Sequence, residues 1–196
     1  PPKSGSDGMG MVDFRGERRT NATHESSTDP EARLMRKGNG QPAKLSFGAH
    51  ALMENRHGLL VDVVITDATL AEPKAAAPLL DRRRRARGNM KTLGADKGYH
   101  TRAFVERLRN KNVTPHIARI EQRSTPGLDG RTTRHEGYAI SQRKRKRIEE
   151  IFGWMKTVGG LRKSRFVGIV KTQLTAYMVG AAYNLLRMAR LQPVTG

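Results

Sequence analysis

The hydrophobic and polar positions along the chain divide it into a polar N-terminal part and a longer part with regular apolar patterns. Residues 1–43 show no steady apolar period, and residues 1–11 are rich in Gly, Ser and Pro. Such a composition is typical of a poorly ordered arm or a long loop. We therefore expect an arm over residues 1–43 and a folded domain over residues 44–191.

A β-hairpin is predicted at the beginning of the folded domain. Residues 44–67 contain two largely apolar stretches separated by the polar turn Asn55 to Gly58, and a glycine-closed turn between such stretches is typical of a hairpin. The second stretch is apolar at successive positions, on both of its faces. We therefore expect this strand to be central in its sheet.

The remaining pattern predicts alternating helices and strands. In chain order these are helix 72–87, strand 89–96, helix 101–111, strand 113–120, loop 121–140, helix 141–158 and helix 170–191. Pro115 removes a backbone donor, so we expect strand 113–120 at an edge of the sheet. This order predicts an α/β fold, a mixed sheet flanked by helices.

The last predicted helix has an apolar repeat. Its members are Leu174, Met178, Ala181, Leu185 and Met188. Apolar residues that recur three and four positions apart share one face of a helix, so we expect this face to be buried.

Charge and composition narrow the classes of function. The chain has 37 Lys and Arg against 18 Asp and Glu, a formal net charge of +19, and a nucleic acid is the usual partner for such an excess. The absence of cysteine excludes disulfides and thiolate metal sites. No apolar run approaches the roughly 20 residues that span a bilayer. A merely basic, highly soluble protein remains an alternative.

Two glutamates in helix 141–158 differ in their expected surroundings. The apolar stripe of this helix consists of Ile148, Ile151, Phe152 and Met155. At 100° per residue, Glu149 lies at the border of this stripe and Glu150 points into solvent. Arg145 and Lys156 share the border with Glu149. An ordinary ion pair between Arg145 and Glu149 is therefore one interpretation.

Asp96 supports a second interpretation. It stands at the carboxyl end of predicted strand 89–96, followed by a glycine turn, and ligands of open α/β sheets bind at that end of the strands. A plain turn or helix-capping aspartate is the alternative. Together, Asp96 and Glu149 could hold a divalent metal ion for phosphoryl transfer on nucleic acid.

Several separated segments resemble bacterial insertion-sequence transposases of the DDE type. They read LGADKGYHTRAFVERLR, PHIA, DGRTTRHEGYAISQRKRKRIEEIFGWMKTVGGLRKSRF and AAYNLLRMARL. The resemblance implies an RNase H-like fold and three carboxylates that hold two Mg²⁺ ions, with Mn²⁺ as a substitute. It assigns Asp96 to the second aspartate and Glu149 to the glutamate.

The resemblance extends to a Tyr-Arg-Glu-Lys signature. Arg145, Glu149 and Lys156 match it, whereas Gln142 stands at the tyrosine position. The first catalytic aspartate has no good match, because Asp7 and Asp13 lie in the polar arm. We therefore expect the first strand and its aspartate to be missing, and this chain alone to be inactive as a truncated copy.

The resemblance also implies partners and a location. Double-stranded DNA, at the element ends and the target, is the expected partner, and a homodimer in the DNA complex is expected. The predicted DNA contacts are Arg143, Lys144, Arg145, Lys146, Arg147 and Lys156. We expect a cytoplasmic, nucleoid-associated bacterial enzyme for metal-dependent DNA cleavage and strand transfer. Two alternatives stay open: an inactive DNA-binding transposase remnant and a non-enzymatic basic nucleic-acid-binding protein.

Overall fold

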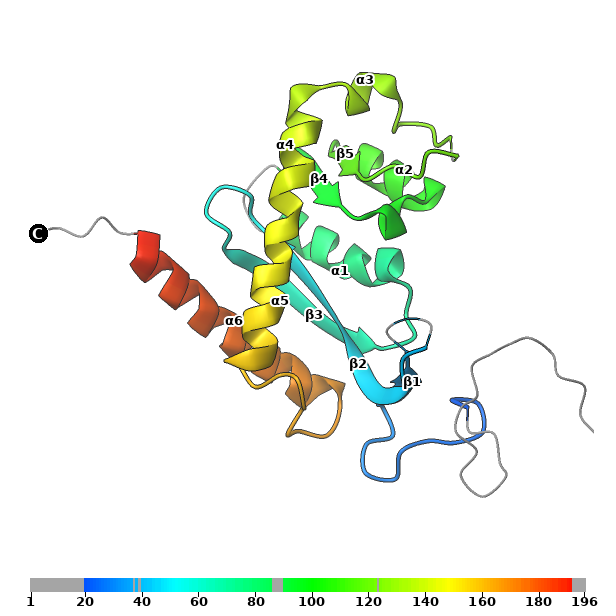
Figure 1. Ribbon diagram of the computed structural model, residues 1–196, viewed down its shortest axis with the longest axis vertical. Coiled ribbons are helices and arrows are strands. Elements are labelled where there is room, and N and C mark those ends of the chain that lie inside the picture. Colours follow the sequence, from blue (N-terminus) through cyan, green and yellow to red (C-terminus); the bar gives the residue numbers. More distant parts are fainter. Residues whose placement is uncertain (1–19, 37, 39, 86–89, 123, 192–196) are drawn as a thin grey trace, which may run out of the picture.

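The computed structural model describes residues 20–191, except positions 37, 39, 86–89 and 123. Its strands are β1 (Arg33–Met35), β2 (Lys44–Met53), β3 (Leu60–Asp67), β4 (Thr92–Ala95) and β5 (Thr114–Ile117). Its helices are α1 (Glu72–Arg85), α2 (Arg102–Asn110), α3 (Gly130–Thr133), α4 (Glu136–Lys144), α5 (Ile148–Thr157) and α6 (Ile169–Leu191). A 3-10 turn, Arg145–Arg147, joins α4 to α5, so that the two form one long rod (Figure 1).

The strands form two sheets. β1, β2 and β3 are antiparallel neighbours in that order, and β4 pairs with β5 in parallel. The predicted hairpin is confirmed, with Ala49 opposite Ile65 in its register. Within the described residues, β5 pairs with β4 alone, so its predicted edge position is confirmed as well.

Part of the predicted arm belongs to the sheet. In β1, Leu34 lies opposite Leu45 of β2, and the Asn21 side chain accepts a hydrogen bond from the Leu34 N–H at 2.7 Å and donates to its carbonyl at 2.9 Å. Residues 33–35 are therefore ordered by pairing with the hairpin. The boundary at residue 44 remains a prediction.

The predicted central position of β3 is wrong. Its only strand neighbour in the described part of the chain is β2, and its other edge is covered by α6. The Gln173 amide accepts from the Ile65 N–H at 2.7 Å and donates to the Val63 carbonyl at 3.1 Å. Asn184 likewise bonds both backbone groups of Leu60 at 2.8 Å. These amides replace a neighbouring strand, which protects the edge from pairing with another chain.

The predicted buried face of α6 is wrong as well, because the helix turns the side that carries Gln173 and Asn184 toward β3. Leu174, Met178 and Leu185 are 61, 67 and 65% exposed. The buried face carries small and polar residues instead, namely Thr172, Ala176, Gly180 and Tyr183. The helix has turned its hydrogen-bonding side toward β3, and its apolar stripe consequently faces outward.

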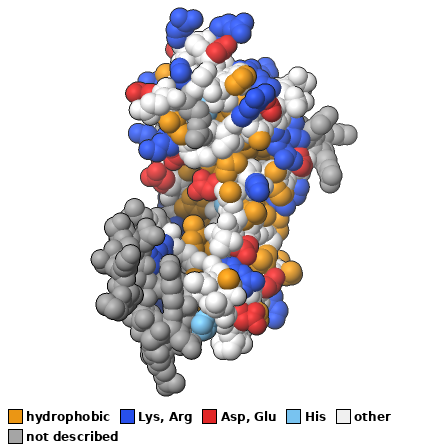
Figure 2. Space-filling model, turned by 90° about the vertical axis from the view of Figure 1, so that its right-hand side faces the viewer, with side chains coloured by type: hydrophobic (Ala, Val, Ile, Leu, Met, Phe, Trp, Pro, Cys, Tyr) orange, Lys and Arg blue, Asp and Glu red, His pale blue; other side chains and the backbone are white. Residues whose placement is uncertain are grey.

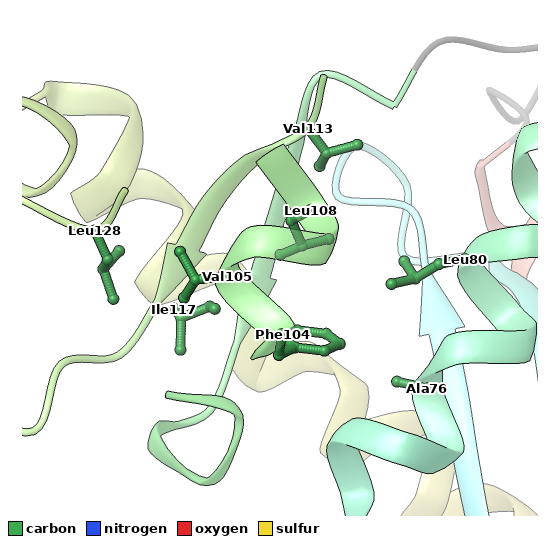
Figure 3. Close-up of a cluster of buried hydrophobic side chains, with 8 residues drawn as sticks. All are labelled: Ala76, Leu80, Phe104, Val105, Leu108, Val113, Ile117 and Leu128. Atoms are coloured by element: carbon green, nitrogen blue, oxygen red, sulfur yellow. The ribbon is translucent and has the colours of Figure 1, made fainter. Parts of the chain in front are cut away.

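Two clusters of apolar side chains form the core. In the first, Ala76 and Leu80 of α1 face Phe104 and Leu108 of α2 (Figure 3). The same cluster continues through Val105, Val113, Ile117 and Leu128. The second cluster lies between β3, α5 and α6 and contains Ile151 and Met155, as the stripe of the predicted helix indicated. On the face shown in Figure 2, apolar side chains gather across the middle of the molecule.

The predicted loop over residues 121–140 is partly helical. The Asp129 carboxylate accepts from the backbone N–H groups of Arg131 and Thr132 and begins α3. His135 begins α4, because its Nδ1 accepts from the Gly137 N–H at 3.0 Å. These two side-chain caps start helices in a segment whose Gly and Thr content indicated a loop. None of the described helices is both long and apolar enough to cross a membrane.

Candidate active site

Asp96 lies at the carboxyl end of β4, where the sequence predicted a ligand-binding aspartate. Its Oδ1 accepts a hydrogen bond from the Lys97 N–H at 2.5 Å and caps the turn Lys97–Tyr99. The side chain is nevertheless 61% exposed. The capping role and an open carboxylate therefore occur together at this residue.

The long helical rod lies against β4 at Gly94. A Cβ atom on Gly94 would lie 3.4 Å from the Ser141 carbonyl oxygen and 3.5 Å from the Arg145 Cβ. These distances are ordinary van der Waals contacts, so the rod packs directly on β4 at this position. This packing places Arg145 beside the strand that ends at Asp96.

Arg145 connects Asp96 to the helix that carries Glu149. Its Nη1 is 3.8 Å from Asp96 Oδ2, and its Nε donates to Gln142 Oε1 at 2.8 Å. The side chain is 25% exposed. Among the ion pairs of the described residues, Arg145 pairs with Asp96 and not with Glu149. The ordinary i,i+4 pair is therefore not what fixes Glu149.

Gln142 fixes Arg145 to strand β5. While its Oε1 accepts from Arg145, its Nε2 donates to the His116 carbonyl at 2.5 Å. His116 itself is buried, and its Nδ1 lies 2.7 Å from Ser141 Oγ. Burial, and then the nearby charges of His135 and Arg109, lower the pKa of His116. From the sequence, Gln142 was noted only as the residue at the tyrosine position, although its i,i+3 spacing from Arg145 is a usable signal.

The two glutamates differ in their contacts. Glu149 is exposed in the first turn of α5, and its carboxylate makes no ion pair with a described residue. The sequence had suggested that Glu150 is free. In the structure its Oε2 lies 3.9 Å from Arg187 Nη1. Glu149 is therefore the carboxylate that remains available one turn beyond Arg145.

A further carboxylate near Asp96 was not predicted. Glu72 lies at the start of α1, and its Oε2 would be 3.3 Å from a Cβ atom on Gly98. Burial, followed by the charges of Glu72 and Asp96, raises the pKa of Tyr99. Both carboxylates thus act on the same phenol. Glu72 and Asp96 lie far apart in the sequence, so no residue spacing could have indicated that they come close together.

The comparison with known protein families decides the lineage. Residues 19–185 match the family described as Transposase DDE domain. The chain belongs to this family. No curated protein and no solved structure matches the chain. The transposase domain thus belongs to a family of divalent-metal-dependent enzymes that bind DNA and carry out transposition.

The predicted DNA contacts of the transposase domain fall into two groups. Arg143, Lys144 and Lys146 are exposed on the rod. The other three make contacts within the protein: Arg145 with Asp96, Arg147 beside Gly58 of the hairpin turn, and Lys156 with its Nζ 5.8 Å from the centroid of the Phe152 ring. Lys156 is exposed as well, so its ring contact does not remove it from the surface that DNA can reach.

The candidate ligands of the transposase domain are of the chemical type that a divalent metal ion prefers. Asp96 and Glu149 offer carboxylate oxygens, the ligands that Mg²⁺ prefers. Asp96 is largely exposed, so a metal ion can reach it from solvent. The described residues contain no group of three His, Cys, Asp or Glu side chains close enough to hold a metal ion together. The described residues thus contribute part of a donor set.

Proposed function

We propose that this domain cleaves DNA and transfers strands by metal-dependent phosphoryl transfer, with Asp96 and Glu149 as two of its three catalytic carboxylates. The observation that supports this proposal is the contact between Arg145 and Asp96. It links the end of β4 to the helical turn that precedes Glu149, in a chain that belongs to the DDE transposase family.

Each residue has a definite role in this proposal. Asp96 and Glu149 would hold Mg²⁺, or Mn²⁺ in its place, through their carboxylate oxygens. When bound, the metal supplies activation of the attacking hydroxyl and stabilisation of the leaving oxygen. Arg145 balances the charge of Asp96 and orients it, while Lys144 and Lys146 contact phosphates of the DNA duplex.

We further propose an RNase H-like sheet in which one more strand fits between β2 and β4 and carries the first aspartate. In support, β4 pairs only with β5 among the described residues, and β2 pairs with β1 only over Lys44 to Ser46. Asp7 and Asp13 lie outside the described residues. We expect the aspartate from sequence upstream of Pro1, as in the family that the chain resembles.

Metal binding tests the two carboxylates without requiring activity. Titration of Mn²⁺ into the protein, followed by electron paramagnetic resonance, should show a weak site that is lost in Asp96→Asn and in Glu149→Gln. Glu150→Gln is the matched control, because it removes the neighbouring carboxylate, which pairs with Arg187. Equal affinity in all four proteins would contradict the assignment.

Cleavage tests the reaction itself. A duplex carrying the element ends is incubated in Mg²⁺ with this chain, and with a version extended upstream to include the preceding strand. We expect activity in the extended protein only, and its loss on Glu149→Gln. Activity of the short chain would contradict the upstream location of the first aspartate. Inactivity of both proteins would favour the inactive DNA-binding remnant.

A further inference from the structure

The outward face of α6 is a continuous apolar stripe. Its members are Val170, Leu174, Tyr177, Met178, Ala181, Leu185 and Met188. All seven are exposed, Val170 to 79%. In Figure 1 the C-terminal half of α6 projects beyond the other elements. Isolated exposed apolar residues are ordinary, but a contiguous stripe marks an interaction surface.

The spacing of the stripe is that of a coiled coil. From Leu174 the apolar positions follow at intervals of four, three, four and three residues, to Met188. This is the heptad repeat that packs one helix against another along a seam. From Val170 to Met188 the stripe extends over about 27 Å, at a rise of 1.5 Å per residue.

The fold holds this stripe outward. Gln173 and Asn184 each make two hydrogen bonds with the backbone of β3, and Tyr183 donates to the Gly58 carbonyl at 3.2 Å. Turning α6 to bury the stripe would break these bonds and leave the edge of β3 without partners. The cover for the stripe must therefore come from beyond the described part of this chain.

The lack of charge along the stripe points to a second copy of the chain as the surface that packs against it. The seven residues of the stripe carry no charge, in a chain whose net charge is +19. The flanking residues Thr175, Ala182 and Ala189 are uncharged too. Lys171 adjoins the N-terminal end of the stripe, but the positions from Leu174 to Met188 along it carry no cation. Two such faces can therefore meet with little repulsion, whereas DNA or an acidic protein would find little positive charge to contact. We propose that two copies of the chain pair through α6, and that this pairing does not require DNA.

The arrangement of the pair follows from its ends and its centre. Lys171 lies near the N-terminal end of the stripe. In a parallel pair the two Lys171 side chains would oppose each other, whereas an antiparallel pair separates them. The antiparallel pair places Ala181 at the two-fold axis, where a small side chain allows close approach, and Leu174 opposite Met188 of the other copy.

Disulfide trapping tests this arrangement, because the chain contains no cysteine. Ala181→Cys should form a disulfide-linked dimer under mild oxidation. A mixture of Leu174→Cys and Met188→Cys should form the mixed dimer in preference to either homodimer. A Leu174 homodimer in preference would overturn the antiparallel arrangement, and no linked dimer from any of these variants would overturn the pairing.

Sedimentation equilibrium of the full chain, with no DNA present, tests the surface itself. We expect a dimer that Met178→Glu with Leu185→Glu dissociates at least tenfold more readily. Val158→Glu is the matched control, since Val158 is 69% exposed and lies on another segment. Circular dichroism should be unchanged, because these side chains lie outside the core. A monomer at all concentrations, or a dimer unaffected by the double variant, would overturn the proposal.

Discussion

At the scale of single residues, the candidate site depends on where Arg145 directs its charge. Spacing along the helix favoured Glu149 as its partner, because the two lie four residues apart. The structure pairs it with Asp96 instead, since Gln142 holds the guanidinium on the side that faces β4. A sequence describes neighbours along one helix well, but not a strand end that only folding brings alongside.

Replacing Gln142 by Ala should destabilise the protein by about 1–3 kcal/mol, because it leaves the half-buried Arg145 Nε and the His116 carbonyl without their partner. Urea unfolding followed by circular dichroism measures the change. Arg143→Ala is the control, as its side chain is exposed on the same helix. Equal midpoints for the two variants would show that the Gln142 contacts contribute little.

The stability of the protein should also decrease as the pH is lowered, because of His116. Burial is the largest cause that lowers the pKa of this side chain below the usual 6.5. The unfolded chain therefore takes up the proton first, and stability that is present above about pH 6.5 is lost as the pH falls toward the folded-state pKa. His50, whose pKa burial also lowers, acts in the same direction.

Denaturant unfolding at about pH 7.5 and about pH 5.5 checks this expectation. His116→Gln should lose less stability over that interval than the unsubstituted protein. His50→Gln gives the contribution of the second histidine separately. An identical loss in His116→Gln and in the unsubstituted protein would rule out a contribution from His116.

At the scale of elements, patterns that describe one element were predictable, and patterns that depend on neighbours were not. The helix expected at 101–111 is α2, Arg102–Asn110, because Thr101 caps it and its apolar residues share one face. The surroundings of β3 and α6 could not be predicted. An apolar strand with helices over its faces resembles a central strand, and nothing in the sequence indicated that Gln173 and Asn184 would cover its edge.

Two glycines, one within α5 and one just after it, should respond oppositely to alanine. Gly153 is exposed in the helix with no heavy atom within 4 Å of an added Cβ. Gly153→Ala should therefore stabilise by about 0.5–1 kcal/mol. An added Cβ at Gly159 would lie 2.7 Å from the Met155 carbonyl oxygen and would clash with Val179. Gly159→Ala should destabilise by about 1–3 kcal/mol. Thermal unfolding of both variants checks the contrast, and shifts of the same sign would contradict this packing.

At the scale of the whole molecule, positive charge and apolar surface have separate places. The exposed cations Arg143, Lys144 and Lys146 lie on the rod formed by α4 and α5. The apolar stripe lies on the outer side of α6. In the proposed pair, the α6 seam would join two domains without using the cations of either rod. Each rod would then remain available to a separate DNA segment, as the proposed cleavage and strand transfer at two element ends requires.

Replacing Arg143, Lys144 and Lys146 together by Ala should therefore weaken duplex binding and flatten its salt dependence. Each phosphate contact contributes about 0.9 to the log–log slope of affinity against salt, so three lost contacts should reduce the slope by about 2.7. The matched control replaces Arg102, Arg131 and Arg134, which removes the same charge. Arg102 and Arg131 already pair with Glu106 and Asp129. Fluorescence anisotropy with one duplex over a range of salt concentrations gives both slopes. Equal reductions would show that DNA responds to the net charge of +19, and a larger reduction for the rod variant would identify the rod as the DNA-contacting surface.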